Sequence, residues 1–148
     1  MKIRDVLKLK NRPVITIGPD DTILSAIQKL CEYDRGCIPV CDNNGELVGI
    51  ITERDIVRKY MKQENPLRKT IVSDYMTQRV AIGIPEDNLD YAISVMKQKR
   101  IRHLPIVEAG RVVGIISMRD LLDTQLEETQ AQIRYVALLP RRSARLPF

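Results

Sequence analysis

The chain has 148 residues, 44% of them apolar and 29% charged, which is ordinary for a globular protein with one or two small domains. A single phenylalanine and no tryptophan argue against an aromatic platform for single-stranded nucleic acid. The formal charge of +5 suggests anionic partners, and phosphates are the obvious candidates, whether on a small molecule or on a polymer.

The sequence shows no pattern of a leader, a membrane span or a zinc site. Its N-terminus, MKIRD, is charged and no long apolar run follows, so we expect a cytoplasmic protein without membrane contact. Three cysteines are spaced C-x5-C and C-x3-C, at Cys31, Cys37 and Cys41. Since there is no C-x2-C pair and the single histidine, His103, is distant, we expect no metal ligation. The thiols are predicted to be reduced and mostly structural, with Cys31 on an apolar helical face.

The first half of the chain predicts three strands and two helices. Residues 14–17 are apolar and β-branched, as in a strand, and Gly-Pro-Asp-Asp at 18–21 turns the chain. The next apolar residues follow the spacing of an amphipathic helix, at Ile23, Ala26, Ile27, Leu30 and Cys31. Strands at 37–41 and 47–51 flank an Asn-Asn-Gly turn, and a helix is predicted from Thr52 to about Met61.

The second half of the chain repeats these elements. Residues 48–55 read VGIITERD, residues 113–120 read VGIISMRD, and the similarity extends back through both halves. The second copy has strands at about 103–107 and 111–116 and a helix that carries Leu89, Ala92, Ile93 and Met96. The predicted divisions are a first repeat at 1–62, a linker at 63–72, a second repeat at 73–125, and a C-terminal helical extension and basic tail at 126–148.

Each copy therefore reads β-α-β-β-α, which predicts a three-stranded sheet with helices on one face. Such a unit leaves part of its core open, so two copies are expected to cover each other. The predicted fold class is α+β, with two β-α-β-β-α repeats packed with pseudo-twofold symmetry. A site is expected in the cleft between the copies.

A hydroxyl residue and an aspartate three positions later begin the last helix of each copy. These pairs are Thr52 with Asp55 and Ser117 with Asp120. One interpretation is a capping box, in which both side chains bond to free amides at the helix N-terminus. The other is a phosphate and ribose site, because a helix N-terminus attracts phosphate and a carboxylate accepts hydrogen bonds from a diol. Arg54 and Arg119 would add donors, and the two interpretations are compatible.

Arg102 and His103 introduce a strand of copy two. They are interpreted either as a solvated charge and a strand-edge histidine, or as a pair of cationic donors that enters the cleft and binds phosphate. The equivalent positions in copy one are Gly36 and Cys37, which cannot donate in this way. Two sites, if both exist, are chemically unequal.

The pattern VSDYMTQRV…P…A…IRHLPIV…GRVVGIISMRDLL closely resembles a cystathionine β-synthase (CBS) domain, and residues 13–61 resemble another. Together they look like a tandem pair, a Bateman module, over residues 1 to about 125. The resemblance implies a module that binds an adenine nucleotide or S-adenosylmethionine as a regulatory ligand, with no required cofactor. It further implies a homodimer that senses energy or metabolite status and acts on an unidentified effector protein.

The resemblance also implies roles for individual residues. The candidates are Ile15, Thr52, Arg54, Asp55, Thr77, Ala81, Arg102, His103, Ser117, Arg119 and Asp120. By resemblance the two aspartates would hold ribose hydroxyls, and the two hydroxyl residues that precede them would contact ribose or phosphate. The Arg-His pair matches the phosphate-contacting pair in the gamma subunit of AMP-activated protein kinase. Ile15, Ala81 and Thr77 would lie on the base side.

Family sites mix elements of both repeats, which implies a particular grouping. Asp120 is expected to act with Arg102, His103 and the first strand of copy one, and Asp55 with Thr52, Thr77 and Ala81. Because copy one lacks the cationic pair, the Asp55 site is expected to be weaker or empty. Copy one also has a longer basic loop at Lys8–Pro13 than copy two has at 77–79.

Residues 126–148 have no counterpart in the module. Residues 126–136 are predicted to extend the last helix, and Pro-Arg-Arg at 140–142 to end it. The tail is basic, with Arg134, Arg141, Arg142 and Arg145. One interpretation is a solvated tail without a binding role. The other is a tail that binds nucleic acid or a membrane surface.

The favoured hypothesis is a non-catalytic regulatory module that binds AMP, ADP, ATP or S-adenosylmethionine between the repeats and signals by a conformational shift. The alternative is a nucleic-acid or protein-partner adaptor that acts through its basic surface. An enzyme is not supported, because the sequence contains no P-loop, GxGxxG or nucleophile motif. Salt dependence separates the first two hypotheses, since polymer binding weakens steeply with salt.

Overall fold

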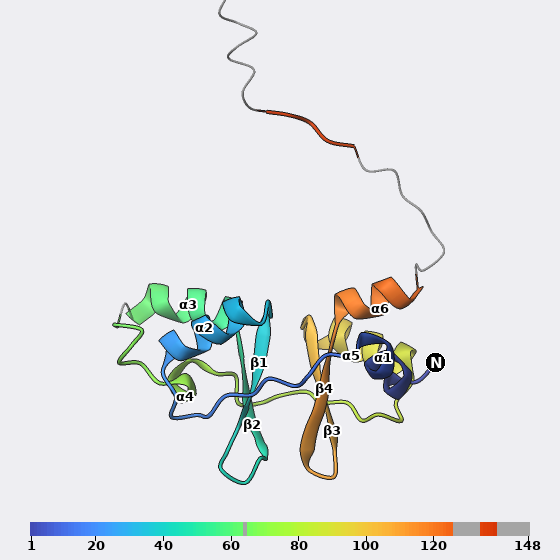
Figure 1. Ribbon diagram of the computed structural model, residues 1–148, viewed down its shortest axis with the longest axis horizontal. Coiled ribbons are helices and arrows are strands. Elements are labelled where there is room, and N and C mark those ends of the chain that lie inside the picture. The colour runs from blue at the N-terminus through green and yellow to red at the C-terminus, as the bar shows by residue number, and fades with distance from the viewer. Residues whose placement is uncertain (64, 126–133, 139–148) are drawn as a thin grey trace, which may run out of the picture.

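The chain folds into two small antiparallel sheets flanked by helices, as the computed structural model describes for residues 1–63, 65–125 and 134–138. Two hairpins stand side by side at the centre, with helices at either flank (Figure 1). The strands are β1 (Cys37–Cys41), β2 (Leu47–Thr52), β3 (His103–Glu108) and β4 (Arg111–Ser117). The helices are α1 (Ile3–Lys10), α2 (Ile23–Glu32), α3 (Glu53–Gln63), α4 (Val72–Tyr75), α5 (Leu89–Lys99) and α6 (Met118–Gln125). The predicted α+β class is confirmed.

The two hairpins share the same register. β1 pairs with β2 from Cys37 opposite Thr52, and β3 pairs with β4 from His103 opposite Ser117. Each ladder shifts register once near its turn, at the same place in both copies. Gly45 closes the predicted Asn-Asn-Gly turn with a φ of 81°, a left-handed conformation that glycine adopts without strain. The strand predictions at 37–41, 47–51, 103–107 and 111–116 are confirmed to within one residue at each end.

The predicted first strand of each copy is reduced to one parallel bridge. Ile17 donates to the Pro39 carbonyl at 3.1 Å and accepts from the Cys41 amide at 2.9 Å. Gly83 likewise donates to the Pro105 carbonyl at 2.9 Å. The ladder cannot gain a further bond towards the N-terminus, because its next donor would be the N–H of a proline, which has none. The prediction of a three-stranded sheet was therefore wrong: each sheet has two strands, and the predicted third strand lies beside the hairpin but pairs with it at one residue only.

The amphipathic helices bury the faces that their sequences predict. The buried residues are Ile23, Ala26 and Leu30 of α2 and Leu89, Ala92 and Met96 of α5. The Thr22 hydroxyl caps α2 by accepting from the Ser25 amide at 3.1 Å. Cys31 was predicted to lie on this face but is exposed, because it lies at the border of the apolar stripe.

The repeats exchange their first helices. In Figure 1, α1 lies with α5 and α6 at one flank, and α4 lies with α2 and α3 at the other. Ile3 and Val6 of α1 are buried in the core of the second repeat. Val72 and Tyr75 of α4 are buried in the core of the first repeat. Each core is therefore completed by a helix that enters from beside the other repeat, which gives the pseudo-twofold arrangement.

Helix α1 replaces part of the basic loop expected at Lys8–Pro13. The helix continues to Lys10, with Asp5 in its first turn and Lys8 and Lys10 in its last, where they complement the helix dipole. Asn11 ends it in a left-handed conformation with a φ of 44°. Helix α4, its counterpart, has four residues where α1 has eight.

The predicted C-terminal extension is described only in part. Helix α6 ends at Gln125, and residues 134–138 form neither helix nor strand. Residues 126–133 and 139–148 lie outside the described ranges, and with them Arg141, Arg142 and Arg145.

The helices of the described residues are short, and the longest of them, α3 and α5, have 11 residues each. Within the described part of the chain, no helix has the length and apolar character needed to cross a bilayer.

Candidate functional site

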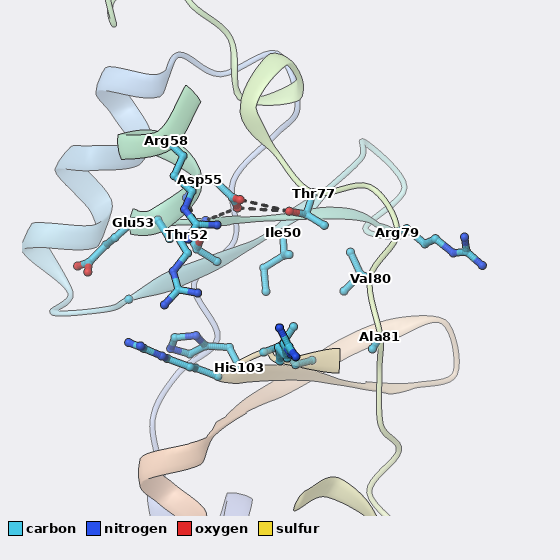
Figure 2. Close-up of a pocket in the computed structure, with 15 residues that line it drawn as sticks. Ile50, Thr52, Glu53, Asp55, Arg58, Thr77, Arg79, Val80, Ala81 and His103 are labelled. Atoms are coloured by element: carbon cyan, nitrogen blue, oxygen red, sulfur yellow. Dashed lines mark hydrogen bonds between the residues drawn. The ribbon is translucent and has the colours of Figure 1, made fainter. Parts of the chain in front are cut away.

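A cavity of about 340 Å³ lies between the two repeats, a volume typical of small-molecule sites. The first repeat contributes Gly36, Ile50, Thr52, Glu53, Arg54, Asp55 and Arg58 to its walls. The later part of the chain contributes Thr77, Arg79, Val80, Ala81, Arg100, Ile101, Arg102 and His103. In Figure 2, Thr52, Asp55 and Arg58 lie on one side of the cavity and His103 lies across from them. Neither repeat alone forms this site.

The Thr52–Asp55 motif is a reciprocal capping box at the start of α3. The Thr52 amide donates to Asp55 Oδ2 at 3.1 Å, and the Asp55 amide donates to Thr52 Oγ1 at 3.0 Å. The Thr77 hydroxyl donates to the same carboxylate, at 3.3 Å to Oδ1 and 3.4 Å to Oδ2 (Figure 2). The carboxylate is thus fixed by backbone geometry and faces the cavity with weak further pairing.

Thr77 is positioned by the backbone of β2. Its amide donates to the Ile50 carbonyl at 2.8 Å, and the Ile50 amide donates to the Thr77 carbonyl at 3.0 Å. This antiparallel bridge joins the segment after α4 to the first repeat. The connection then runs past Val80 and Ala81, which give the cavity an apolar side.

His103 enters from β3, and the absence of a side chain at Gly36 gives it room. A Cβ atom at position 36 would lie 3.2 Å from His103 Nε2. Burial, followed by the charge of Lys10, holds the pKa of His103 below its ordinary 6.5, with Asp120 opposing and Arg102 adding to the effect. The imidazole is therefore neutral near pH 7, with a proton to donate and a lone pair to accept.

The structure brings most of the predicted site residues to one cavity. Seven of them line the cavity: Thr52, Arg54, Asp55, Thr77, Ala81, Arg102 and His103. The remaining four, Ile15, Ser117, Arg119 and Asp120, are described but lie outside that lining. Arg102 and His103 were expected beside Asp120, and they lie near it: His103 pairs with Ser117 across the hairpin, and the charges of Lys10 and Asp120 act on His103. The same two residues also line the Asp55 cavity. The second repeat therefore supplies the Asp55 cavity with an arginine and an imidazole, the donors that Gly36 and Cys37 cannot provide.

Sequence reasoning missed three further arginines at this cavity. Arg58, Arg79 and Arg100 join Arg54 and Arg102, so five arginines and two carboxylates, Asp55 and Glu53, line the cavity. Arg79 extends away from the other labelled side chains in Figure 2 and forms part of the rim. Arg58 was predictable, because it follows Arg54 by one helical turn on the same face. Arg79 and Arg100 lie outside regular elements, so no periodicity pointed to them.

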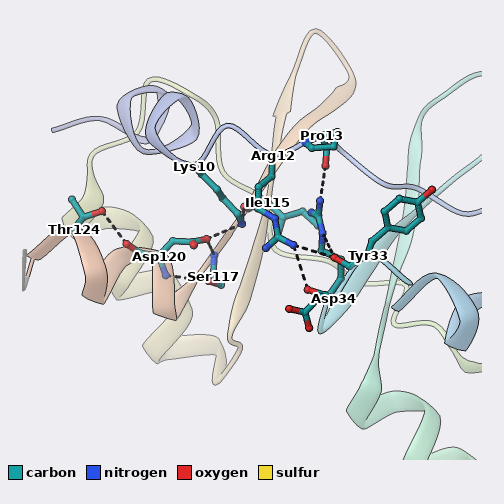
Figure 3. Close-up of polar contacts among 10 residues, drawn as sticks. Lys10, Arg12, Pro13, Tyr33, Asp34, Ile115, Ser117, Asp120 and Thr124 are labelled. Carbon is teal, nitrogen blue, oxygen red and sulfur yellow. Dashed lines mark hydrogen bonds and ion pairs between the residues drawn. The ribbon is translucent and has the colours of Figure 1, made fainter. Parts of the chain in front are cut away.

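The second motif, Ser117–Asp120, is also a capping box but has a different neighbour. The Ser117 amide donates to Asp120 Oδ2 at 2.8 Å, and the Asp120 amide donates to Ser117 Oγ at 3.1 Å. Lys10 Nζ donates to the same Oδ2 at 2.8 Å and to the Ile115 carbonyl at 2.7 Å (Figure 3). Burial opposes ionisation, but the bonds from Lys10 and Ser117 outweigh it and hold the pKa of Asp120 below its usual value.

The described residues contain no cluster of three or more His, Cys, Asp or Glu side chains with the geometry to hold a metal ion. Cys37 is buried, and burial raises the pKa of its thiol to about 12. This thiol therefore stays protonated and unreactive at neutral pH.

Comparison with known proteins places both repeats in one family. Residues 3–62 and 72–127 each match the CBS domain. The chain is 35% identical over 118 residues to the CBS domain-containing protein YhcV of Bacillus subtilis, covering 80% of this chain and 83% of YhcV. It is 35% identical over 127 residues to protein MK0525 of Methanopyrus kandleri, covering 84% of this chain and 64% of that protein.

A further relative is an enzyme. The chain is 38% identical over 112 residues to the inosine-5'-monophosphate dehydrogenase of Methanocaldococcus jannaschii, covering 75% of this chain and 21% of the dehydrogenase. The chain thus spans less than two thirds of two of these three relatives.

Solved structures give the same result. The CBS domain protein NE2398 matches with a TM-score of 0.81 and 32% identity, over 85% of this chain and 98% of that one. The CBS domain pair of protein MJ0100, solved with 5'-methylthioadenosine and S-adenosyl-L-methionine, matches with a TM-score of 0.75 and 28% identity, over 84% and 95%. Sequence and fold agree across both repeats, and the chain belongs to the CBS domain family as a tandem pair of CBS domains.

Proposed function

We propose that this chain is a non-catalytic regulatory module that binds an adenine nucleotide in the cavity between its repeats. The observation that carries the proposal is the placement of Asp55. Its carboxylate is held by the helix cap and opens onto a cavity whose opposite wall carries Arg102 and His103. A diol acceptor and a set of phosphate donors thus face one space of suitable volume.

The residues that line the cavity suit the three parts of a nucleotide: ribose, phosphates and base. The ribose hydroxyls would donate to Asp55, whose present partner, the Thr77 hydroxyl, is held only at 3.3–3.4 Å and is readily exchanged. The phosphates would lie among the arginines, near the positive end of the α3 dipole. The base would pack against the apolar side at Val80 and Ala81. Arginine suits phosphate because its planar group donates two parallel hydrogen bonds.

The charge of the cavity favours a ligand with phosphates over S-adenosylmethionine. Five arginines outnumber the two carboxylates, and an additional cation such as a sulfonium group would be repelled. The related pair of MJ0100 was solved with 5'-methylthioadenosine and S-adenosyl-L-methionine, which share the adenosyl group with AMP, ADP and ATP. We therefore expect this chain to bind the adenosyl group that these ligands share. At the position of their sulfur-linked groups, we expect it to prefer phosphate.

Binding at this cavity would act on the arrangement of the repeats. A ligand that contacts α3 on one side and β3 on the other stabilises the orientation that brings both walls into contact with it. We propose that this shift, in a cytoplasmic homodimer, is transmitted to a separate effector protein. The dehydrogenase activity of the M. jannaschii relative is not transferred, because the matched region is 21% of that enzyme.

The proposal is tested by isothermal titration of ATP, ADP, AMP and S-adenosylmethionine into the wild type and two matched variants, Asp55→Asn and Asp120→Asn. We expect a phosphate-bearing nucleotide to bind the wild type. Asp55→Asn should weaken it about 10- to 100-fold, since a hydrogen bond to a charged group contributes about 1.5–3 kcal/mol. Asp120→Asn removes the same charge from the same kind of cap but from a residue that does not line the cavity, so it should change the affinity much less, through its charge on His103 alone.

Two results would contradict the proposal. One is no heat from any adenosyl ligand with folded, ligand-free protein. The other is equal weakening by both substitutions, which would remove the assignment to the Asp55 cavity. Repeating the titration at two salt concentrations tests the adaptor alternative, because affinity for a polyanion falls far more steeply with salt than affinity for one nucleotide.

A further inference from the structure

The two repeats can be matched contact by contact at their exchanged helices. The Ile3 amide at the start of α1 donates to the Asp87 carbonyl at 2.9 Å, and the Val72 amide at the start of α4 donates to the Asp21 carbonyl at 2.7 Å. Ile3 and Val72 are both fully buried. The two helices therefore begin at equivalent points of the fold.

The match continues one turn further along. Gly114 of β4 lies against the side chain of Leu7, and Gly49 of β2 lies against the side chain of Met76. Leu7 of α1 is thus the structural counterpart of Met76, the residue that follows α4. Up to this point the two halves use the same contacts.

The symmetry ends immediately after these residues. Behind Met76 the chain leaves the helix, and the Thr77 amide donates to the carbonyl of Ile50, which lies opposite Pro39 in its hairpin. Behind Leu7 the helix continues to Lys10. The equivalent carbonyl, that of Ile115 opposite Pro105, accepts instead from Lys10 Nζ at 2.7 Å. A lysine side chain therefore takes the position of a backbone bridge.

The same ammonium group also neutralises Asp120, the counterpart of Asp55. The ion pair measures 2.8 Å, and its side chains are only 16% exposed for Lys10 and 20% for Asp120 (Figure 3). At Asp55 the equivalent partner is an uncharged hydroxyl at 3.3 Å. A ribose that approached Asp120 would have to displace a largely desolvated ammonium and leave it without its counter-ion, which is strongly unfavourable.

We propose that Lys10 is an internal occupant of the position that a ribose would take at Asp120 and determines which of the two pseudo-symmetric aspartates accepts a nucleotide. Each chain then binds one nucleotide, at Asp55. This inference rests on the proposed function for its ligand, whereas the occupancy by Lys10 is a property of the protein alone. The determinant is the additional length of α1, which carries Lys10 to a position that α4 does not reach.

The first experiment counts bound ATP per chain, by titration and equilibrium dialysis, in the wild type, Lys10→Ala and Lys8→Ala. Lys8 lies on the same helix and is exposed, so it controls for loss of a charge from α1. We expect one equivalent in the wild type and in Lys8→Ala, and two in Lys10→Ala. Adding Asp120→Asn to Lys10→Ala should return the count to one. A second equivalent in the wild type that Asp120→Asn abolishes would overturn the proposal, as would a count of one in folded Lys10→Ala.

The second experiment needs no nucleotide. Wild type and Asp120→Asn are acetylated with limiting reagent, and the rates at Lys10 and Lys8 are compared by mass spectrometry. We expect Lys10 to react several-fold more slowly than Lys8 in the wild type and to approach the rate of Lys8 in Asp120→Asn. Equal rates in the wild type would overturn the occupancy. Absence of ATP binding to every variant would refute the proposed function and the stoichiometry together, while protection of Lys10 would still establish the occupancy.

Discussion

At Asp55 and Asp120 the same four-residue motif caps a helix in the same way and faces different neighbours. Each carboxylate accepts from the amide of its own motif, at 3.1 Å and 2.8 Å. Capping uses one side of the carboxylate, so it neither requires nor prevents ligand binding. The difference lies in the partner: a hydroxyl from Thr77 at one aspartate and the ammonium of Lys10 at the other. The neighbouring side chain, and not the motif, decides which aspartate is available.

His103 should make nucleotide affinity depend on pH. Its pKa is below 6.5 in the free protein through burial and the charges of Lys10 and Arg102, with Asp120 opposing, and it faces Asp55, Arg54 and Arg58 across the cavity. A bound phosphate favours the imidazolium and raises that pKa, so binding takes up a proton. Affinity should therefore rise as the pH falls through the range around and below 6.5.

The measurement is titration calorimetry of ATP between about pH 8 and about pH 5, in two buffers of different ionisation enthalpy, on the wild type and His103→Gln. Protonation of the nucleotide itself is common to both proteins and cancels in the comparison. The wild type should show proton uptake that His103→Gln lacks. Parallel pH profiles for the two proteins would show that the phosphates do not approach His103.

At the scale of elements, the exchanged helices approach the hairpins at two glycines. A Cβ atom added at Gly49 of β2 would lie 2.6 Å from Met76 Sδ and 3.0 Å from the Thr77 carbonyl oxygen. At Gly114 of β4 all of the near atoms belong to the Leu7 side chain. The first site is confined by backbone that the Ile50–Thr77 bridge fixes, and the second by a side chain that can change rotamer.

Gly49→Ala should therefore destabilise the protein more than Gly114→Ala. Overpacking against fixed backbone costs about 1–3 kcal/mol, whereas displacement of one leucine rotamer costs about 1 kcal/mol or less. Urea unfolding at equal protein concentration measures both. Equal losses would mean that the Leu7 side chain is held as firmly as the Thr77 backbone.

At the scale of the whole molecule, the exchange of α1 and α4 makes the repeats interdependent. Removal of the first repeat would take α1 from the second core, and removal of the second would take α4 from the first. The chain connections cross between the two halves in opposite directions (Figure 1). Neither core is complete within one continuous repeat, so the pair is expected to be the unit that folds.

Thermal unfolding should accordingly occur in a single transition, with calorimetric and van't Hoff enthalpies in agreement. Ile38→Ala in the first core and Ile106→Ala in the second, both fully buried in the wild type, should each lower the midpoint of that one transition. Each should cost about 2–4 kcal/mol, the usual cost of such a cavity. Two resolved transitions, of which each substitution moves only one, would contradict this view.

Much of the architecture could be predicted from the sequence, because it depends on local signals. The Asn-Asn-Gly turn and the flanking apolar runs predicted β1 and β2, and the helical spacing of Ile23 and Ala26 predicted α2. Internal repetition then predicted the same elements in the second half. The short third strand could not be predicted in this way, because its length depends on Pro39 and Pro105 of a neighbouring strand.

By itself, the sequence determined the repeat, its hairpins and the two helix caps, since turn chemistry, periodicity and capping act over a few residues. The tertiary structure alone decided which side chains share a site. Arg102 and His103 line one cavity with Asp55 because the two repeats pack against each other, and Lys10 pairs with Asp120 because α1 packs on the second repeat. Such contacts join residues that are distant in the chain, and packing against the neighbouring repeat selects among pairings that the local pattern leaves equivalent.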